Sequence, residues 1–193
     1  MIILAGGIGA GKSVVARILR LKGFGVYDCD FEARHLMESD PEVKAKILAA
    51  AGGEVYDTAG RLDRRLLASR LFTDASLRGE INAIVHASVL RDVKRWLEER
   101  QENVFVETAI AAESGLAREA ESIWIVEAST ETRVSRVKNR DSRPEEEILR
   151  IMQAQTLEEE KLAKLGVPFI RIANDEDSPI LETINFLLNK EKC

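Results

Sequence analysis

The chain has 193 residues and a formal net charge of −5, with 45% apolar and 32% charged residues. This length suits one domain with an inserted subdomain, and the composition is that of a folded protein. The acidic balance predicts no nucleic-acid partner, because duplex binding needs a basic surface. No apolar run is long enough to cross a membrane, and the short apolar start does not fit a signal peptide. Cys29 and Cys193 make no disulfide framework, so we expect a cytoplasmic protein.

The first thirteen residues combine a buried strand with a glycine-rich loop. Ile2 to Ala5 is an unbroken apolar run, typical of a strand buried on both faces. Gly6 to Ser13 then reads Gly-x-x-x-x-Gly-Lys-Ser, and residues 14–20 continue with apolar positions at helical spacing. Glycines let backbone N–H groups approach an anion, and the helix adds its positive N-terminal dipole. The pattern predicts a nucleoside triphosphate site, with Lys12 on the β- and γ-phosphates and the Ser13 hydroxyl on Mg²⁺.

Two acids follow the second expected strand, Gly25–Asp28, which forms a βαβ unit with the first strand. Ligands of open α/β sheets bind outside the carboxyl ends of the strands, so we expect Asp28 and Asp30 at the same crevice as the glycine loop. Asp30 has two interpretations: an N-cap for a helix over residues 31–37, or a general base on an acceptor hydroxyl. The phosphate-binding loop favours the base.

Residues 39–100 are predicted to be mostly helical, with breaks near Pro41 and Gly52. This block is too long for a simple crossover, so we interpret it as an inserted subdomain on the acceptor side of the crevice. It holds Arg64 and His86. Their spacing alone favours a solvated helix terminus for Arg64 and a hydrogen-bonded, partly buried side chain for His86.

The later part of the chain supplies three further strands. Residues 103–107 form a buried strand that ends in Glu107, where phosphate-loop proteins use an acid, usually Asp, to help hold Mg²⁺. Residues 122–126 and 167–172 complete the set, and Asn174 lies in the loop after the last strand.

Two helices around an Asp-Ser-Arg-Pro segment separate the last two strands. Arg140 and Arg143 lie at this bend. One interpretation is a lid that brings cations onto transferring phosphates, and the other is favourable charge at the end of a helix.

These elements predict an α/β fold: a parallel sheet of the P-loop NTPase type flanked by helices, with a helical substrate-binding insert and a helical lid. Within one domain we expect a core over residues 1–38, 101–132 and 166–193, an insert over 39–100 and a lid over 133–165.

Several motifs of this chain occur together in one known family. They are Gly6–Ser13, Val26–Asp30, Gly60–Leu67, Ile84–His86, Glu113–Leu116, Arg140–Asp141, Ala154–Gln155 and Glu159–Lys161. The glycine loop is shared by many NTPases, but the second Asp after the strand, the Leu-Asp-Arg segment and the late Arg-Asp are more specific. With these motifs the chain resembles dephospho-coenzyme A kinase, the last enzyme of coenzyme A biosynthesis, over nearly its whole length.

The resemblance implies transfer of the ATP γ-phosphate to the ribose 3′-hydroxyl of dephospho-coenzyme A by a monomer or small homo-oligomer. It implies a base role for Asp30, phosphate-stabilising cations at Lys12 and Arg140, acceptor-side positions at Arg64 and His86, and an adenine-side position at Asn174. The expected nucleotide-binding residues are Gly9, Ala10, Gly11, Lys12, Ser13, Val14, Arg140 and Asn174. The expected metal ligands are Ser13, Glu107 and Asp28.

The sequence departs from the family pattern at three places. Val14 stands where the family usually has Thr, Ala87 where it has Pro, and Ala109–Glu113 replaces a Pro-Leu-Leu-Phe-Glu run. These changes concern the acceptor pocket and a second hydroxyl near the phosphates, and they do not affect Lys12, Asp30 or Arg140.

Two other functions remain as alternatives. A nucleoside monophosphate or shikimate-type kinase would meet its acceptor with arginines rather than with an Asp. A switch GTPase would carry an Asn-Lys-x-Asp segment, and residues 189–192 fail at the last position.

Overall fold

A computed structural model describes residues 1–100, 104–109, 111–112, 115–141 and 143–190, and within these it leaves out the side chains of residues 157–159. Cys193, Glu113 and the first residue of the expected strand 103–107 lie outside the described residues. The chain divides into two units, here called the sheet unit (Met1–Tyr27 with Glu102–Cys193) and the helical unit (Asp28–Gln101).

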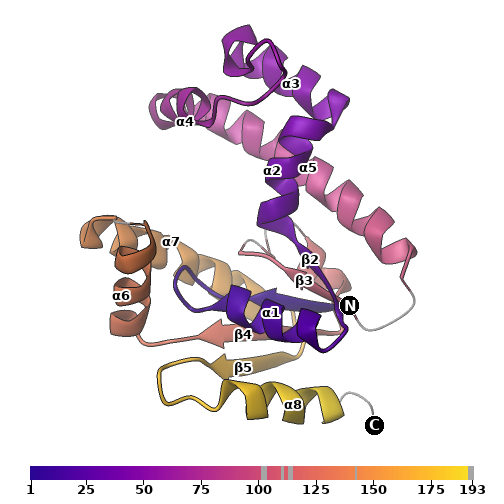
Figure 1. Cartoon of the computed structure of the whole chain (residues 1–193), viewed down its shortest axis with the longest axis vertical. Helices are drawn as coiled ribbons and strands as arrows, with labels where there is room; N and C mark the ends of the chain where they lie inside the picture. Colours follow the sequence, from indigo (N-terminus) through magenta and orange to yellow (C-terminus); the bar gives the residue numbers. More distant parts are fainter. Residues whose placement is uncertain (101–103, 110, 113–114, 142, 191–193) are drawn as a thin grey trace. The chain divides into compact units, whose positions relative to one another are not determined.

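A five-stranded sheet with strand order β2-β3-β1-β4-β5 forms the centre of the sheet unit (Figure 1). The strands are β1 (Ile2–Ala5), β2 (Gly25–Asp28), β3 (Val104–Glu107), β4 (Ser122–Glu127) and β5 (Phe169–Ala173). The β1–β3, β1–β4 and β4–β5 pairs are parallel. All residues of β1 and β3 are buried, which agrees with the apolar run of β1 and with the three apolar residues that precede Glu107 in β3.

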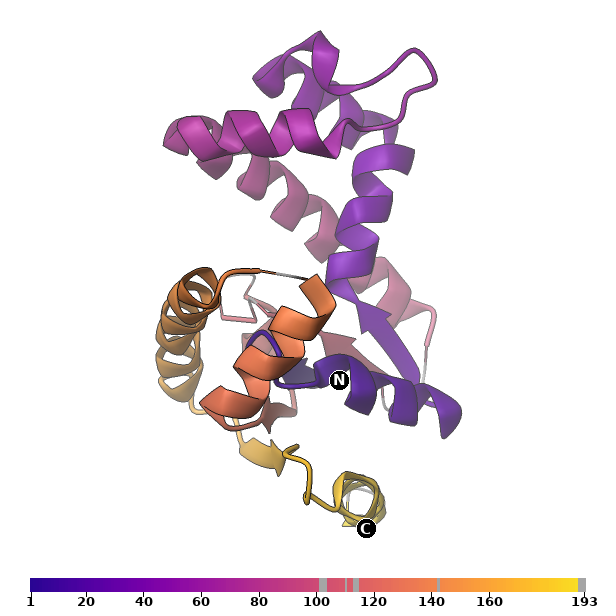
Figure 2. The same ribbon diagram turned by 60° about the vertical axis from the view of Figure 1, so that its left-hand side comes forward.

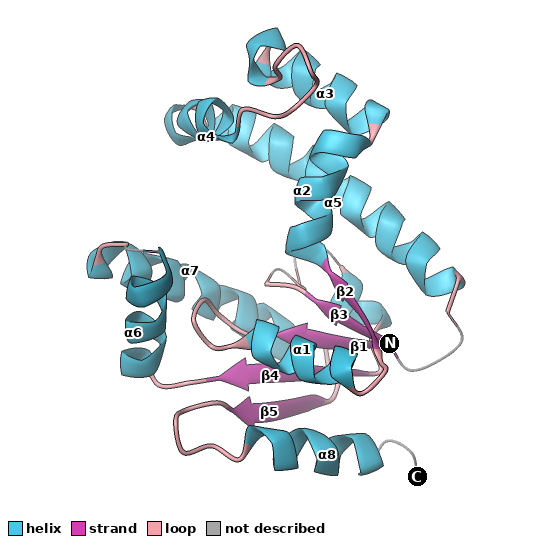
Figure 3. Cartoon of the chain, viewed as in Figure 1, coloured by secondary structure: helices cyan, strands magenta, loops and turns pink. Residues whose placement is uncertain are grey.

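Helices flank this sheet (Figure 3). They are α1 (Lys12–Leu21), α6 (Thr130–Asp141), α7 (Glu145–Ala163) and α8 (Ile180–Lys190), with a short 3₁₀ turn at Leu116–Glu119. Leu19 of α1 and Ile184 of α8 share one apolar core with Leu4, Phe105 and Trp124 of the strands. The observed architecture confirms the predicted α/β fold with a flanked parallel sheet.

The helical unit has its own apolar core. Its elements are α2 (Cys29–Ser39), α3 (Pro41–Ala51), a 3₁₀ turn at Gly53–Val55, α4 (Arg64–Thr73) and α5 (Ala75–Glu98). Ile47, Leu67 and Ile81 bring α3, α4 and α5 together. The predicted insert begins at residue 39, whereas the unit begins at Asp28, because α2 packs on α3 and α5. None of the helices in the described part of the chain is long and apolar enough to span a membrane.

Each of the four α-helices of this unit begins after an aspartate whose side chain accepts backbone N–H groups of the first turn. The caps are Asp28 for α2, Asp40 for α3, Asp63 for α4 and Asp74 for α5. Such a cap satisfies N–H groups that have no partner inside the helix. The interpretation of Asp30 as an N-cap is therefore wrong, because Asp28 accepts the Phe31 N–H at 3.0 Å and α2 starts two residues earlier than expected.

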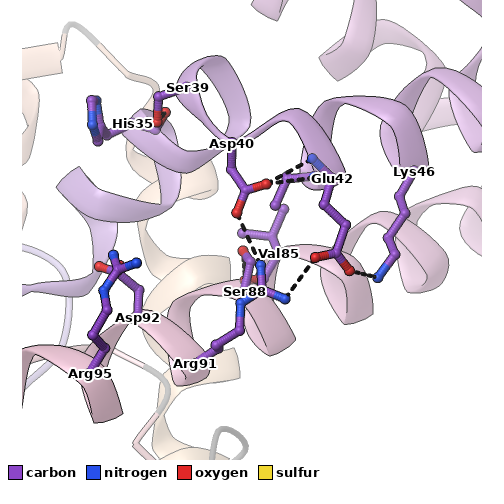
Figure 4. Close-up of polar contacts among 11 residues, drawn as sticks. His35, Ser39, Asp40, Glu42, Lys46, Val85, Ser88, Arg91, Asp92 and Arg95 are labelled. Carbon is purple, nitrogen blue, oxygen red and sulfur yellow. Dashed lines mark hydrogen bonds and ion pairs between the residues drawn. The ribbon is translucent and has the colours of Figure 1, made fainter.

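Asp40 also joins α3 to α5 (Figure 4). It accepts the N–H groups of Glu42 and Val43, and its other oxygen pairs with Arg91 of α5 at 3.0 Å. Arg91 pairs in addition with Glu42 at 3.1 Å. Burial raises the pKa of Asp40, but the N–H bonds from Val43 and Glu42 and the charge of Arg91 outweigh it and hold the pKa below its ordinary value of 3.8.

We predict that Asp40→Ala lowers the free energy of unfolding by about 1 kcal/mol, because it removes a helix cap. Asp40→Asn should cost less, because Asn also caps helices and only the pairing with Arg91 is weakened. Chemical denaturation of both variants measures this.

The pH dependence of stability separates the contribution of the helix cap from that of the Asp40–Arg91 ion pair. The lowered pKa means that the advantage of the wild type over Asp40→Asn is present above pH 3.8 and is lost as the pH falls through the folded-state pKa. Equal losses in both variants, unchanged down to pH 3, would contradict this account.

Candidate active site

The glycine loop between β1 and α1 has backbone angles that require glycine. Gly6, Gly9 and Gly11 all have positive φ, at 145°, 76° and 96°. A Cβ on Gly9 would lie 2.6 Å from the Arg133 carbonyl oxygen, and one on Gly11 would lie 2.0 Å from the Asn174 side chain. The loop is therefore both conformationally special and tightly enclosed, which explains its glycines without reference to any ligand.

Side chains from distant parts of the sheet unit hold this loop. Arg133 of α6 donates from Nε to the Ile8 carbonyl at 2.9 Å, and Gln155 of α7 accepts the Ile8 N–H at 2.7 Å. Asn174, which is 7% exposed, donates from Nδ2 to the Ala10 carbonyl at 2.8 Å. The Ile8 side chain packs on the apolar cluster that joins α6 to α7. Figure 2 shows α6 and α7 as neighbouring helices of this unit.

The two polar residues of the motif lie at the N-terminus of α1. Lys12 is the first residue of the helix, and its Nζ donates to the Gly6 carbonyl at 2.6 Å, so the side chain folds back over the loop. Ser13 follows it in the first turn, where N–H groups have no partner within the helix. A lysine, a hydroxyl and a helix N-terminus together suit a bound phosphate chain.

A pocket of about 370 Å³ lies beside the loop. It is lined by Gly7, Val126, Glu127, Ala128, Arg133, Ala173 and Asp175. The Ser129 N–H donates to Asp175 at 3.0 Å, and this bond, followed by bonds from the Thr132 and Ser129 side chains, lowers the pKa of Asp175. The pocket is at the carboxyl ends of β4 and β5, where α/β sheets bind ligands.

Glu107 is the last residue of β3 and lies in register with Leu4 of β1, next to the strand end that leads into the glycine loop. The residue is buried, at 7% exposed. Carboxylate and hydroxyl oxygens are ligands that Mg²⁺ accepts, and Mg²⁺ takes the rest of its shell from phosphates and water. By donor chemistry Ser13 and Glu107 fit this metal. One oxygen of Asp28 accepts the hydrogen bond that caps α2, so the part of Asp28 in metal binding stays a prediction.

The predicted lid arginines pair with neighbouring acids. Arg140 makes a two-point contact with Asp141, from Nε at 2.7 Å and from Nη2 at 2.8 Å. The bond from Arg140 is the largest cause that lowers the pKa of Asp141, and it raises the pKa of Arg140. Arg143 binds Glu147 at 2.6 Å. The Arg140 side chain is 63% exposed, and its action on phosphates stays a prediction.

The predicted acceptor-side residues belong to the helical unit. Asp30 is in the first turn of α2 and exposed, and its side chain makes no hydrogen bond or ion pair with another described residue. Arg64 begins α4 and contacts Glu38 at 3.1 Å, and half-buried His86 lies on α5. The residues predicted to bind the nucleotide thus lie in the sheet unit and those predicted to bind the acceptor lie in the helical unit, and their approach to each other stays a prediction.

The sequence did not single out Arg133, Arg136 and Gln155 as loop contacts. Arg133, Arg136 and Arg140 are three and four residues apart and share one helix face, a signal that could have indicated the first two. Gln155 offers no local signal, because its partner Ile8 is 147 residues away.

Comparison with known proteins identifies the family of this site. The family model for dephospho-CoA kinase matches residues 1–177. The chain belongs to the dephospho-CoA kinase family. A dephospho-CoA kinase of Bacteroides fragilis is 34% identical over 97% of this chain and 92% of its own.

Solved structures share the fold of this chain. A crystal structure of a Thermus thermophilus protein is 32% identical, with a TM-score of 0.80 over 100% of this chain and 97% of that one. The dephospho-CoA kinase from Campylobacter jejuni has the same fold, at 18% identity and a TM-score of 0.70, over 98% and 96% of the two chains. The predicted family and fold are confirmed.

We predict that Gly11→Ala weakens ATP binding tenfold or more, because the new Cβ would meet Asn174 at 2.0 Å in a backbone region that L-residues avoid. Gly79→Ala is the matched control, since its Cβ meets nothing within 4 Å in the helical unit. Calorimetric titration with ATP measures the affinity of both variants. Wild-type affinity in Gly11→Ala would show that the loop conformation is not needed.

Proposed function

We propose that this protein transfers the γ-phosphate of ATP to the ribose 3′-hydroxyl of dephospho-coenzyme A, the final step of coenzyme A biosynthesis. The observation that carries the proposal is the family match over residues 1–177, which covers the helical unit and most of the sheet unit. The fold alone does not identify the acceptor, because one fold hosts many activities.

The sheet unit is proposed to bind ATP. Backbone N–H groups of the loop and the N-terminus of α1 face the phosphates, and Lys12 exchanges its contact with the Gly6 carbonyl for the β- and γ-phosphates. Arg140, released from Asp141, offsets charge on the transferring group. An arginine in this role raises the turnover rate by about 10³–10⁵-fold.

Ser13 and Glu107 are the residues proposed to hold Mg²⁺. The bound ion neutralises charge on the β- and γ-phosphates. Glu107 is one methylene longer than the Asp usually found at this place, and its fixed register beside Leu4 determines how far its carboxylate reaches.

The helical unit is proposed to bring the acceptor. Asp30 accepts the proton of the attacking 3′-hydroxyl and orients its oxygen toward the γ-phosphate. Because Asp28 caps α2, capping of this helix does not occupy the Asp30 carboxylate and does not compete with its role as a base. Arg64 and His86 are proposed to contact the acceptor from α4 and α5.

The other functions considered are less well supported. A nucleoside monophosphate or shikimate-type kinase shares the fold class, but the family match favours dephospho-coenzyme A. A nucleotide-dependent switch has no observation in its favour. A cytoplasmic location, a monomer or small homo-oligomer, and the lack of a nucleic-acid partner stay predictions from the sequence.

An assay of ADP release tests the proposed function. We expect ADP formation to depend on dephospho-coenzyme A and on Mg²⁺, with little release when the acceptor is absent. Shikimate and a nucleoside monophosphate are the control acceptors. Equal ADP release with and without dephospho-coenzyme A would overturn the kinase assignment and favour a switch ATPase.

The same assay tests whether Asp30 is the general base. Asp30→Asn should lower turnover by about 10²–10⁴, the usual contribution of a general base, while calorimetry shows unchanged ATP affinity. Glu32→Gln, an acid two residues further along α2, is the matched control and should keep its turnover. Equal loss of turnover and of ATP affinity in Asp30→Asn would contradict the base role.

A further inference from the structure

Three consecutive carbonyl groups of the glycine loop accept side-chain hydrogen bonds. Arg133 donates to the Ile8 carbonyl at 2.9 Å, Arg136 to the Gly9 carbonyl at 3.4 Å, and Asn174 to the Ala10 carbonyl at 2.8 Å. We call these three donors the carbonyl clasp. Two come from α6 and one from the loop after β5, so distant parts of the chain fix the direction of each carbonyl.

The direction of a carbonyl also fixes the next N–H group. In a planar trans peptide the C=O of one residue and the N–H of the next point in opposite directions. The Ile8 carbonyl points toward Arg133 and the Ala10 carbonyl toward Asn174. The N–H groups of Gly9 and Gly11 therefore point to the opposite side of the loop. Neither N–H bonds to another residue in the described part of the chain.

Two other N–H groups of the loop are engaged within the protein. The Ala10 N–H bonds to the Gly7 carbonyl at 3.2 Å, and the Ile8 N–H bonds to Gln155 at 2.7 Å. The clasp thus leaves the N–H groups of Gly9 and Gly11 for an anion, beside the N-terminus of α1.

We propose that Asn174 is a positioning residue for the phosphate loop, which acts by holding the Ala10 carbonyl outward so that the Gly11 N–H faces the nucleotide's phosphates. This inference rests on ATP binding by the loop and does not depend on the identity of the acceptor. It differs from the adenine-side position that the family resemblance implies, because it connects Asn174 to phosphates rather than to the base.

The surroundings of Asn174 suit this role. Its side chain is buried, and its own N–H donates to the Glu127 carbonyl at 2.8 Å, which fixes it against the end of β4. A Cβ on Gly11 would lie 2.0 Å from Nδ2, so the amide sits directly against the loop. Since the amide is neutral, its removal changes the geometry of the loop without removing a charge that could itself attract phosphate.

The test measures three ligands with Asn174→Ala: ATP, inorganic tripolyphosphate and adenosine. We expect ATP and tripolyphosphate to bind roughly tenfold more weakly, the usual cost of a lost buried hydrogen bond, and adenosine to bind as it does to the wild type. Asn189→Ala, at an exposed position of α8, is the matched control and should bind all three ligands normally.

Hydrogen–deuterium exchange of the peptide over residues 6–13 gives a second measurement that needs no ligand. Exchange of this segment should be faster in Asn174→Ala, while the strands of the sheet exchange as in the wild type. Asn174→Ser, too short to reach the Ala10 carbonyl, serves in the same measurements if the alanine variant does not fold.

The outcomes separate the possible roles. Loss of ATP and adenosine binding with unchanged tripolyphosphate binding would assign Asn174 to the base and overturn the inference. Unchanged binding of all three ligands with unchanged exchange would overturn it as well. Failure of the wild type to bind ATP or tripolyphosphate would instead contradict the proposed nucleotide site.

Discussion

A loop that binds phosphate through its backbone must keep its carbonyl groups turned away from the anion, and the sheet unit is arranged around this constraint. Three consecutive carbonyls, from Ile8 to Ala10, accept side-chain hydrogen bonds from α6 and from the loop after β5. Buried β1 fixes the start of the loop and α1 fixes its end. The glycines allow the backbone conformation of the loop, and the side chains of the carbonyl clasp fix the direction of its peptide groups.

This arrangement links the nucleotide site to parts of the chain that are far away in sequence. Ile8 meets the apolar cluster of α6 and α7, and Asn174 follows β5. Helix α6 therefore contacts the phosphate loop directly, through Arg133, Arg136 and the apolar cluster around Ile8. Arg140, further along the same helix, pairs with Asp141 through Nε and Nη2, and its action on phosphates stays a prediction.

Much of the fold could be predicted from the sequence, because buried parallel strands and the Gly-x-x-x-x-Gly-Lys-Ser motif are local patterns. The position of the cap at α2 could not, since Asp28 and Asp30 are both suitable and only the backbone decides between them. The roles of Gln155 and Asn174 toward the loop depend on partners more than 140 residues away, which no local pattern reveals. The family motifs indicated that Asn174 mattered, but not that it contacts the Ala10 carbonyl.

We propose that the γ-phosphate of ATP bound at the loop moves to a ribose hydroxyl of an acceptor that the helical unit binds. The most direct measurement follows ATP labelled in its γ-phosphate in the presence of dephospho-coenzyme A and Mg²⁺. We expect the label to appear in coenzyme A, on the ribose 3′-oxygen. Release of the label as inorganic phosphate, or its appearance on another oxygen of the acceptor, would contradict it.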